Sequence, residues 1–552
     1  FLILSSIFKH LYLLITNFNN LYYNIISVKN IKIINNISIF FFLTVFSIFI
    51  THTYYFDHHA LGNALIQNND GIYTDETNLF FLINNSSPSF FFVIISFLLK
   101  LNFSASSINA LLTFIPTLLN LSGIYLISRF ITSSIFLSFL IALTAILLKK
   151  NFGDIDYPTL MFTEHTNGLI AYSLSTFILG LLTIRNLSFA IIFCLLLLSI
   201  HLVIGIWMFG LIILTYSFIF ENKNIKKILF ITLIIFLIAL FYFNSHINYA
   251  EIPYEFSQKD YDDYFYYIEA HRNNMGDLRN MYFDYVLKSF ILLILIFFYL
   301  KHSRSNIFNN YNFFFKTLSL SIIFSGIIYF IYKIFPEIFP EIAIRTIPQR
   351  FFLIHSVVGY PIMISIFYIF LKKFFIFKNF KKDYALQSIA VILILHLLQQ
   401  QEALKLRFQN IEIIKENKLT EQLFWQNVND LKLSGYILTS NYLCNKTIIY
   451  SKSPILFCFE SLDYIPYLPK LASPSQDMTQ KILGISYSDV KYKNLGGISE
   501  IEIKKAYENK KIAQWKIIKD KFNVNTLIVP KEWNLKLDNL ILDSKYKVYK
   551  ID

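Results

Sequence analysis

Long apolar runs alternate with short polar segments over residues 1–401. Several of these runs reach about 17–25 residues, the length that an α-helix needs to cross a lipid bilayer. We therefore predict a polytopic α-helical membrane protein with about eleven spans, a count of twelve or thirteen being the alternative. The predicted spans are residues 37–54, 105–128, 131–148, 167–185, 187–202, 204–220, 228–245, 283–300, 312–334, 350–371 and 383–400.

Six groups of positively charged residues next to the predicted spans fall on one side of this arrangement, which the positive-inside rule makes cytoplasmic. Counting Pro88–Leu101 as a span would break the alternation, and its apolar run of about a dozen residues suits an interfacial or re-entrant helix better. Residues 1–27 are apolar but contain Lys9 and His10, which favours an interfacial helix over a signal peptide. The positively charged groups on the cytoplasmic side are Lys29 with Lys32, Arg129, Arg185, Lys223–Lys227, Lys301–Arg304 and Lys372–Lys382.

The composition agrees with a membrane protein. Hydrophobic residues make up 55% of the chain, whereas charged residues make up only 15%, well below the roughly 25% of a soluble domain. The mean hydropathy is +0.50. The net charge of +13 could suggest nucleic-acid binding, but the cations gather in short loops between apolar runs. We therefore predict a lipid-bilayer partner and no nucleic-acid partner.

The topology divides the chain into two domains. Residues 1–401 form a multi-pass module whose external segments are residues 55–104, 149–166, 246–282 and 335–350, with a short external turn at His201. Residues 402–552 are charged and contain short β-branched runs, which predicts an extracytoplasmic α/β domain. Its predicted strands are residues 435–440, 447–451, 455–459, 526–530 and 546–551, and its predicted helix is residues 504–522.

The chain has three cysteines, too few for a disulfide framework. Cys194 lies in an apolar run and is predicted to be a small core residue. Cys444 and Cys458 could pair if their domain is extracytoplasmic, and two free buried thiols are the alternative.

Titratable residues collect in the external segments. An acid at a water-exposed membrane face can act as a general base, and arginine can bind phosphate oxygens with two parallel hydrogen bonds. A lipid-phosphate-sugar donor would require both groups on one face. The candidates are Asp57, His58 and His59 after the first span, Asp154, Asp156, Glu164 and His165 in the second loop, His201, and Arg345 and Arg350 in the last loop.

Each candidate also has a structural explanation. Asp57, Asp154 and Asp156 could serve only to solvate loops, and Glu164 with His165 could begin a helix whose dipole favours an acid. His201 could hydrogen-bond a neighbouring helix, and Arg345 with Arg350 could bind lipid headgroups. The sequence predicts no definite cofactor. A divalent metal at His58 and His59 is an alternative, although no third ligand follows at a fixed spacing.

This layout resembles the GT-C class of membrane glycosyltransferases, in a branch of uncharacterised bacterial members. The resemblance is carried by the first loop FDHHALGNALIQNNDGIYTDE (56–76), the second loop FGDIDYPTLMFTEHT (152–166) and the tail WKIIKDKFNVNTLIVPKEWNL (515–535). It implies a polyprenyl-phosphate-linked sugar donor, with an acid of the first loop as catalytic base, and Asp57 matches that acid best. It also implies that Pro88–Leu101 lies along the membrane surface.

The resulting hypothesis is a glycosyltransferase in the bacterial inner membrane, with its terminal domain in the periplasm or cell exterior. The acceptor would be a glycan, a lipid or a protein, although a WWD-type motif for protein acceptors is missing from the sequence. A transporter or flippase of lipid-linked saccharides is one alternative, but the paired broken helices and symmetric halves typical of transporters are not apparent. A polysaccharide polymerase or ligase and a non-catalytic scaffold are the others.

Overall fold

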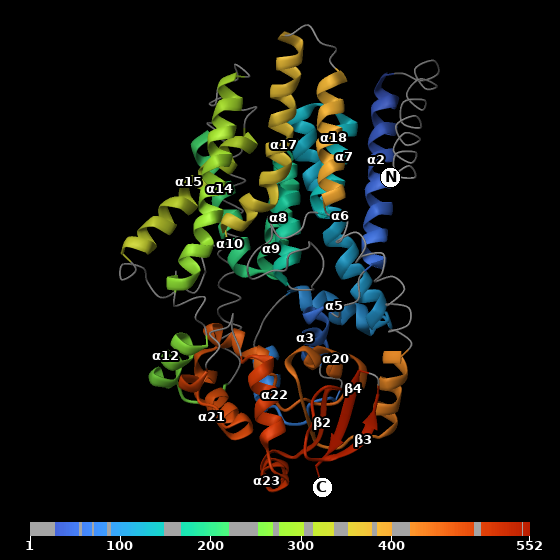
Figure 1. Cartoon of the computed structure of the whole chain (residues 1–552), viewed down its shortest axis with the longest axis vertical. Helices are drawn as coiled ribbons and strands as arrows, with labels where there is room; N and C mark the ends of the chain where they lie inside the picture. The colour runs from blue at the N-terminus through green and yellow to red at the C-terminus, as the bar shows by residue number, and fades with distance from the viewer. Residues whose placement is uncertain are drawn as a thin grey trace.

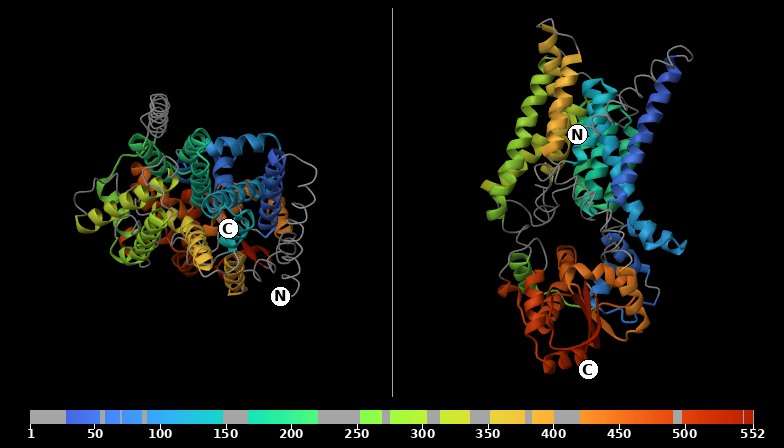
Figure 2. Two further views of the ribbon diagram at one scale, coloured as in Figure 1. Left: turned by 90° about the horizontal axis from the view of Figure 1, so that it is seen from above. Right: turned by 45° about the vertical axis from the view of Figure 1, so that its right-hand side comes forward.

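Helices dominate one half of the molecule, and a domain with a four-stranded sheet forms the other half (Figure 1). The computed structural model describes residues 28–53, 58–68, 71–85, 90–147, 167–219, 252–268, 275–302, 313–335, 351–377, 383–399, 420–490, 498–543 and 545–551. The right view in Figure 2 shows that the two halves follow one another along the longest axis.

The described residues of ten predicted spans are mainly helical, and the span predicted at 228–245 lies outside the described residues. Apolar runs of this length satisfy their own backbone hydrogen bonds as helices, so they need no partner strand. The helices are α2 (Val28–His52), α6 (Ala105–Thr132), α7 (Ile135–Leu147), α8 (Asn167–Thr183), α9 (Leu187–Ile200), α10 (Leu202–Ile219), α14 (Met275–His302), α15 (Phe313–Ile334), α17 (Phe351–Phe377) and α18 (Asp383–Gln399).

Three of the described helices are long and apolar enough to cross a membrane, over Ala105–Thr132, Phe313–Ile331 and Val357–Phe375. The prediction of eleven full-length spans is therefore only partly confirmed. For α7, α8 and α9 the physical reason is helix length, since these helices have 13, 17 and 14 residues. Helix α9, for example, has 14 residues and is about 21 Å long, against about 30 Å for the hydrocarbon core.

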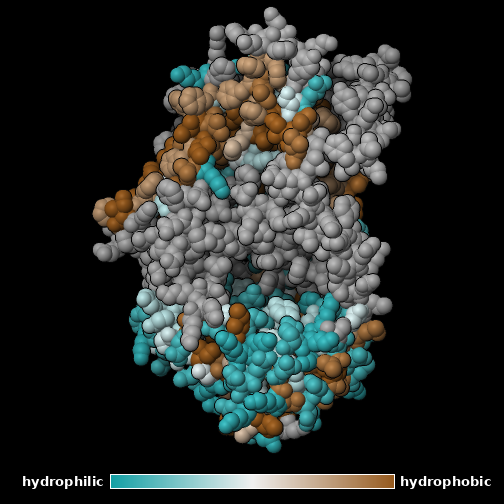
Figure 3. All heavy atoms as spheres, in the orientation of Figure 1, coloured by the Kyte–Doolittle hydropathy of each residue, from teal (hydrophilic) through white to brown (hydrophobic). Residues whose placement is uncertain are grey.

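Large apolar side chains lie exposed on the outside of the helical half. Phe41 on α2 is 61% exposed, and Phe297 and Phe298 on α14 are more than half exposed. Figure 3 shows this apolar surface in brown above a largely hydrophilic terminal domain. An apolar patch of this kind marks a lipid or protein contact surface.

The run Pro88–Leu101 contains a short helix, α5 (Phe90–Lys100), as its length predicts. It has 11 residues, which gives a length of about 16 Å, too short to cross a bilayer. Val93, Phe97 and Leu101 are exposed apolar residues on or beside it.

Helices α6 and α8 cross at two facing glycines. A Cβ atom on Gly123 would lie 2.5 Å from the carbonyl oxygen of Thr176, and one on Gly180 would lie 2.9 Å from the Cα of Gly123. Both contacts are with backbone, which cannot rotate away. Small residues at a helix crossing allow this close approach in membrane bundles.

The substitution Gly123→Ala is expected to destabilise the bundle by about 1–3 kcal/mol, because the added methyl group must push α6 away from α8. Thermal unfolding of the purified protein in detergent measures the effect. Gly210→Ala on α10 is the matched control, since a Cβ atom there meets nothing within 4 Å. Equal melting temperatures for the two variants would contradict the close crossing.

The terminal domain contains a mixed sheet with strand order β1-β2-β4-β3. Strand β1 (Tyr436–Thr439) pairs parallel to β2 (Val524–Pro530), and β4 (Tyr546–Lys550) pairs antiparallel to both β2 and β3 (Asp538–Leu542). The helices α21 (Ala472–Leu483), α22 (Glu500–Asn509) and α23 (Ile512–Phe522) contribute to its core, in which Trp515 and Tyr507 are fully buried.

The predicted strands at 435–440, 526–530 and 546–551 are confirmed, whereas β3 was not predicted. The strand predicted at 447–451 is wrong, because those residues form the π-helical turn η5 (Thr447–Ser451). In the segment 455–459 only Ile455 makes a bridge, to Ile437 of β1. The single helix predicted at 504–522 is two helices, α22 and α23, separated by the extended residues Lys510 and Lys511.

Tertiary contacts explain the misassigned run at 447–451. Its two isoleucines are consecutive, and both are buried, but against different parts of the first external loop. Ile448 packs in a cluster with Ile66 and Tyr73, whereas Ile449 packs in a cluster with Ala60 and Leu61. A helical turn buries both side chains against these neighbours.

Candidate functional site

The first external loop packs against the terminal domain. Its helices α3 (His59–Asn68) and α4 (Leu79–Asn85) contact the short helical elements that follow β1 and precede α21 (Figure 1). Asn63 donates a hydrogen bond to the hydroxyl of Tyr464, and Leu79 and Ile83 belong to the main core of the terminal domain. The loop is therefore part of the folded domain.

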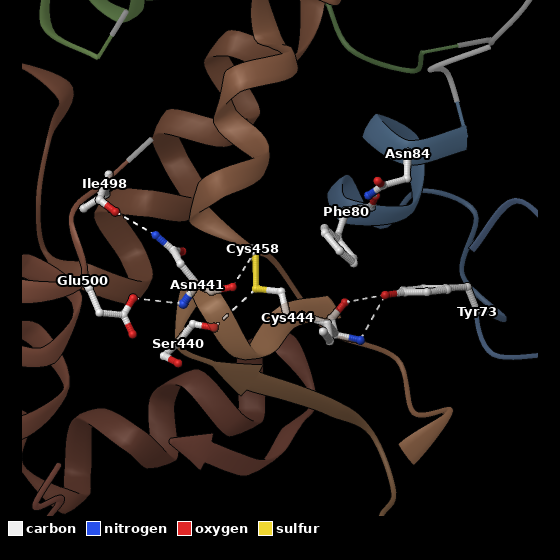
Figure 4. Close-up of a disulfide and its surroundings, with 10 residues drawn as sticks. Tyr73, Phe80, Asn84, Ser440, Asn441, Cys444, Cys458, Ile498 and Glu500 are labelled. Atoms are coloured by element: carbon white, nitrogen blue, oxygen red, sulfur yellow. Dashed lines mark hydrogen bonds between the residues drawn. A yellow bond between two sulfur atoms is a disulfide. The ribbon is translucent and has the colours of Figure 1, made fainter. Parts of the chain in front are cut away.

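Tyr73 makes the most specific contact of this interface. Its hydroxyl donates to the carbonyl oxygen of Ile455 at 3.2 Å and accepts from the N–H of the same residue at 3.0 Å (Figure 4). Asn78 donates in turn to the carbonyl oxygen of Leu456. Burial raises the pKa of Tyr73 well above its usual value, so the hydroxyl keeps its proton and remains able to donate.

A disulfide joins Cys444 to Cys458 beside this contact (Figure 4). Both cysteines lie in one buried cluster with Tyr73 and with Phe80 and Phe81 of α4. Of the two alternatives that the sequence left open, a disulfide and two free thiols, the disulfide is confirmed. Cys194 is a buried free cysteine, as predicted. The crosslink holds the segment after β1 against the strand-like segment that Tyr73 contacts.

The third external loop also docks on the terminal domain. Its helix α12 (Gln258–Tyr267) contacts α21, and Tyr261, Tyr264 and Phe265 enter the domain core. The hydroxyl of Tyr264 donates to the carbonyl oxygen of Leu462 at 2.7 Å. The described parts of the predicted external segments 55–104 and 246–282 therefore gather on the same domain.

Most predicted site residues lie outside the described residues, so their predicted roles remain predictions. These residues are Asp57, Asp154, Asp156, Glu164, His165, Arg345 and Arg350. His59 begins α3, and only its backbone is described. The two predicted residues with described side chains are His58 and His201.

His58 is a buried residue that connects three elements. Its backbone N–H donates to the side-chain oxygen of Asn109 on α6, and its ring Nδ1 accepts from the N–H of Ala60 at the start of α3. The ring also packs against the ring of Phe91 on α5 in a T-shaped arrangement. Nδ1 thus acts as a helix cap, a role that competes with metal binding through this atom.

His201 occupies the turn between α9 and α10. Its backbone is extended, its N–H donates to the carbonyl oxygen of Leu197, and its ring Nδ1 lies 3.5 Å from the N–H of Ile204. This geometry favours the structural explanation, in which the imidazole bonds to a neighbouring helix. Among the described residues, no three His, Cys, Asp or Glu side chains are placed to share a metal ion.

The sequence reasoning missed a buried polar network in the terminal domain. The carboxylate of Glu421 forms a 2.7 Å ion pair with Lys446 and accepts a hydrogen bond from the hydroxyl of Tyr546. Glu421 and Tyr546 are separated by 125 positions in the chain, so no local motif could have indicated the contact.

A second missed acid, Glu500, lies next to β1. It accepts a hydrogen bond from the backbone N–H of Asn441 at 3.1 Å (Figure 4). Partial burial raises the pKa of Glu500, and the nearby carboxylates Glu460 and Glu532 act in the same direction. Its place in the first turn of α22, where an acid suits the helix dipole, was the local signal.

No protein-family model and no curated protein matches the sequence. The functional assignment therefore depends on the residues and contacts described above.

Proposed function

We propose that the chain is a membrane glycosyltransferase of the GT-C type. It would move a sugar from a polyprenyl-phosphate donor to an acceptor hydroxyl at the outer face of a bacterial inner membrane. One observation carries the proposal. The acid-rich loop that follows the first predicted span is folded into the terminal domain through Tyr73 and Asn78, beside the disulfide.

The disulfide supports an extracytoplasmic terminal domain, because disulfides persist mainly in oxidising compartments. The charges support the same orientation. Asn109 of α6 contacts the docked loop through His58, and Arg129 lies 20 positions further along the same helix, which is about 30 Å. Lys32 lies at a similar distance from the loop-proximal end of α2. Cations at the far end suit a cytoplasmic face.

The eleven-span topology is part of the proposal. The first loop, the third loop and the terminal domain gather on one side, which agrees with an even number of crossings between each pair. The short apolar helices α7, α8 and α9 would then cross together with neighbouring residues or in a locally thinned bilayer.

The proposed reaction assigns one role to each predicted group. The carboxylate of Asp57 takes the proton of the acceptor hydroxyl, whose oxygen attacks the anomeric carbon of the sugar. The bond from that carbon to the phosphate oxygen breaks as the new bond forms. Arg345 and Arg350 would stabilise the charge on the departing lipid phosphate. Asp57 directly precedes His58, whose backbone and ring are both anchored.

Transfer of a radiolabelled sugar from a panel of polyprenyl-phosphate sugars tests the proposal directly. The purified full chain is incubated with each donor and a membrane extract as acceptor source, and labelled product is separated from the donor. Product formation with one donor supports a transferase. If the protein instead moves labelled donor across vesicles without breaking the sugar–phosphate bond, it is a transporter and the proposal is wrong.

A fluorescent protein that matures only in the cytoplasm is expected to stay dark when fused after Asp552, because the terminal domain is proposed to be outside. A fusion after Leu147, the last residue of α7, should also stay dark, and a fusion after Thr132, the last residue of α6, should be bright. The cell fluorescence of the three fusions is the measurement. A bright fusion after Asp552 would overturn the topology.

The variants Arg345→Lys and Arg350→Lys are expected to weaken use of the donor. Lysine keeps the charge but loses the planar group that holds two phosphate oxygens at once. Loss of one such charge-assisted contact corresponds to roughly a tenfold fall in kcat/KM. Unchanged kinetics in both variants would instead assign these residues to lipid headgroups.

A further inference from the structure

The disulfide between Cys444 and Cys458 is enclosed on two sides. Each cysteine is only 3% exposed. On the domain side, the two sulfur atoms lie 3.5 and 4.0 Å from backbone carbonyl oxygens of the segment that follows β1. On the other side, Tyr73 and Phe80 of the first external loop pack in the same buried cluster as the crosslink (Figure 4). A reductant can therefore reach the sulfur atoms only after the loop or the domain backbone has moved.

The first external loop contacts both of the segments that the disulfide joins. The hydroxyl of Tyr73 bonds to the N–H and to the carbonyl oxygen of Ile455, which lies three positions before one cysteine. Ile66 of α3 packs in one cluster with Ile448, which lies four positions after the other cysteine. The crosslink holds these two segments at a fixed spacing, so the docking surface of the loop is preorganised.

The docked loop and the crosslink therefore stabilise each other. Because the loop covers the sulfur atoms, attack on them requires a local opening, and its rate depends on how often the loop opens. Because the crosslink fixes the docking surface, loss of the crosslink weakens docking. Thermodynamic linkage makes the two effects reciprocal, so docking favours the disulfide by the same factor by which the disulfide favours docking.

We propose that the first external loop is a lid whose docking is linked to the redox state of Cys444 and Cys458. The partner is a dithiol reductant. One of its thiolates attacks a sulfur atom of the crosslink, and the other sulfur atom leaves as a thiolate. The second thiol of the reductant then resolves the mixed disulfide. Two electrons and two protons pass to the cysteine pair, the reductant becomes a disulfide, and the loop is released.

The inference concerns loop docking and thiol chemistry, so its test is independent of whether the chain transfers sugars. A consequence for activity follows only if the proposed function holds. The same loop carries Asp57 and the anchored His58, so opening of the lid would move the proposed base and slow transfer. The experiments below use thiol labelling and hydrogen exchange, which can succeed or fail without any transfer activity.

Reduction of the folded full chain in detergent measures the protection by the lid. The protein is treated with dithiothreitol, and the released thiols are labelled with a maleimide-polyethylene glycol that shifts the gel band. A Cys194→Ala background leaves only the crosslinked pair to be labelled. In this background, Tyr73→Phe should be reduced roughly tenfold faster than the parent, because the lid loses both hydrogen bonds to Ile455.

Tyr549→Phe is the matched control for this variant. The hydroxyl of Tyr549 also donates to a backbone carbonyl oxygen, that of Trp533 at 3.1 Å, and accepts from a backbone N–H, that of Leu535 at 3.3 Å. Its ring is buried in the same domain but belongs to a different cluster from the crosslink. This control should be reduced at the rate of the parent. An unchanged rate in Tyr73→Phe, or the same acceleration in Tyr549→Phe, would overturn the lid.

Hydrogen exchange of the double variant Cys444→Ser and Cys458→Ser tests the reverse effect. Backbone amides of α3 and α4 should exchange at least about fivefold faster than in the wild-type protein, the lower end of usual coupling factors. Helix α12 docks on the same domain through a different cluster, so its exchange should stay unchanged. Unchanged exchange in α3 and α4, or equal acceleration in α12, would show that docking and the crosslink are not linked.

Discussion

Replacing Asp57 with asparagine is expected to lower the turnover of sugar transfer by about 10²–10⁴-fold, the usual effect of losing a general base. Asparagine has the same shape but cannot take a proton from the acceptor hydroxyl. Donor binding should therefore be retained. Initial rates with the active donor, together with a separate measurement of donor affinity, distinguish lost chemistry from lost binding.

Asp75→Asn is the matched control for this variant. Asp75 is exposed, and its carboxylate accepts hydrogen bonds from the N–H and the hydroxyl of Thr77 at 2.8 and 2.6 Å. The amide oxygen of asparagine can accept the same bonds, so the turn is preserved. The Asp75→Asn variant should therefore keep nearly the wild-type turnover. The assignment of Asp57 fails if both variants lose activity equally, or if Asp57→Asn stays active while Asp154→Asn or Asp156→Asn does not.

Removing the disulfide with the double substitution Cys444→Ser and Cys458→Ser is expected to destabilise the terminal domain by about 3 kcal/mol. The two cysteines are 14 positions apart, and a crosslink over a loop of this length mainly restricts the unfolded chain. Urea unfolding followed by tryptophan fluorescence measures the loss, since Trp515 and Trp533 lie in the domain core.

The control for the disulfide is Cys194→Ala, which removes the free cysteine of the helical half and leaves the crosslink intact. It should not move the unfolding midpoint of the terminal domain. Dithiothreitol should lower the midpoint of the wild-type protein and leave that of the double variant unchanged. A wild-type midpoint that is insensitive to dithiothreitol would contradict a crosslink in the folded protein.

Local patterns in the sequence were enough for much of the architecture. Continuous apolar runs predict helices such as α6 and α15, because only a helix satisfies its own backbone in an apolar environment. Short β-branched runs bounded by polar residues predicted β1, β2 and β4. The change in composition after residue 401 indicated the terminal domain. These signals are carried by neighbouring residues, so they can be read without knowing the fold.

The candidate site was harder to predict from the sequence than the architecture. Acids of the external loops identify a general location, and the role of Asp57 rests on its position after the first predicted span. The contacts that organise this region were not predictable. Tyr73 and Ile455 are 382 positions apart in the chain, and Asn63 and Tyr464 are 401 positions apart. No periodicity links residues at such separations.

Tertiary structure alone decided three features of this protein. It brought Cys444 and Cys458 together, where the sequence left pairing and free thiols equally open. It turned residues 447–451 into a helical turn, because Ile448 and Ile449 are buried against different parts of the first loop. It brought Tyr442, Lys531 and Tyr546 together from three segments that meet at one edge of the sheet because β1 and β2 are parallel. Sequence patterns report the preferences of neighbouring residues, whereas these features arise from packing between distant segments, which outweighs local propensity.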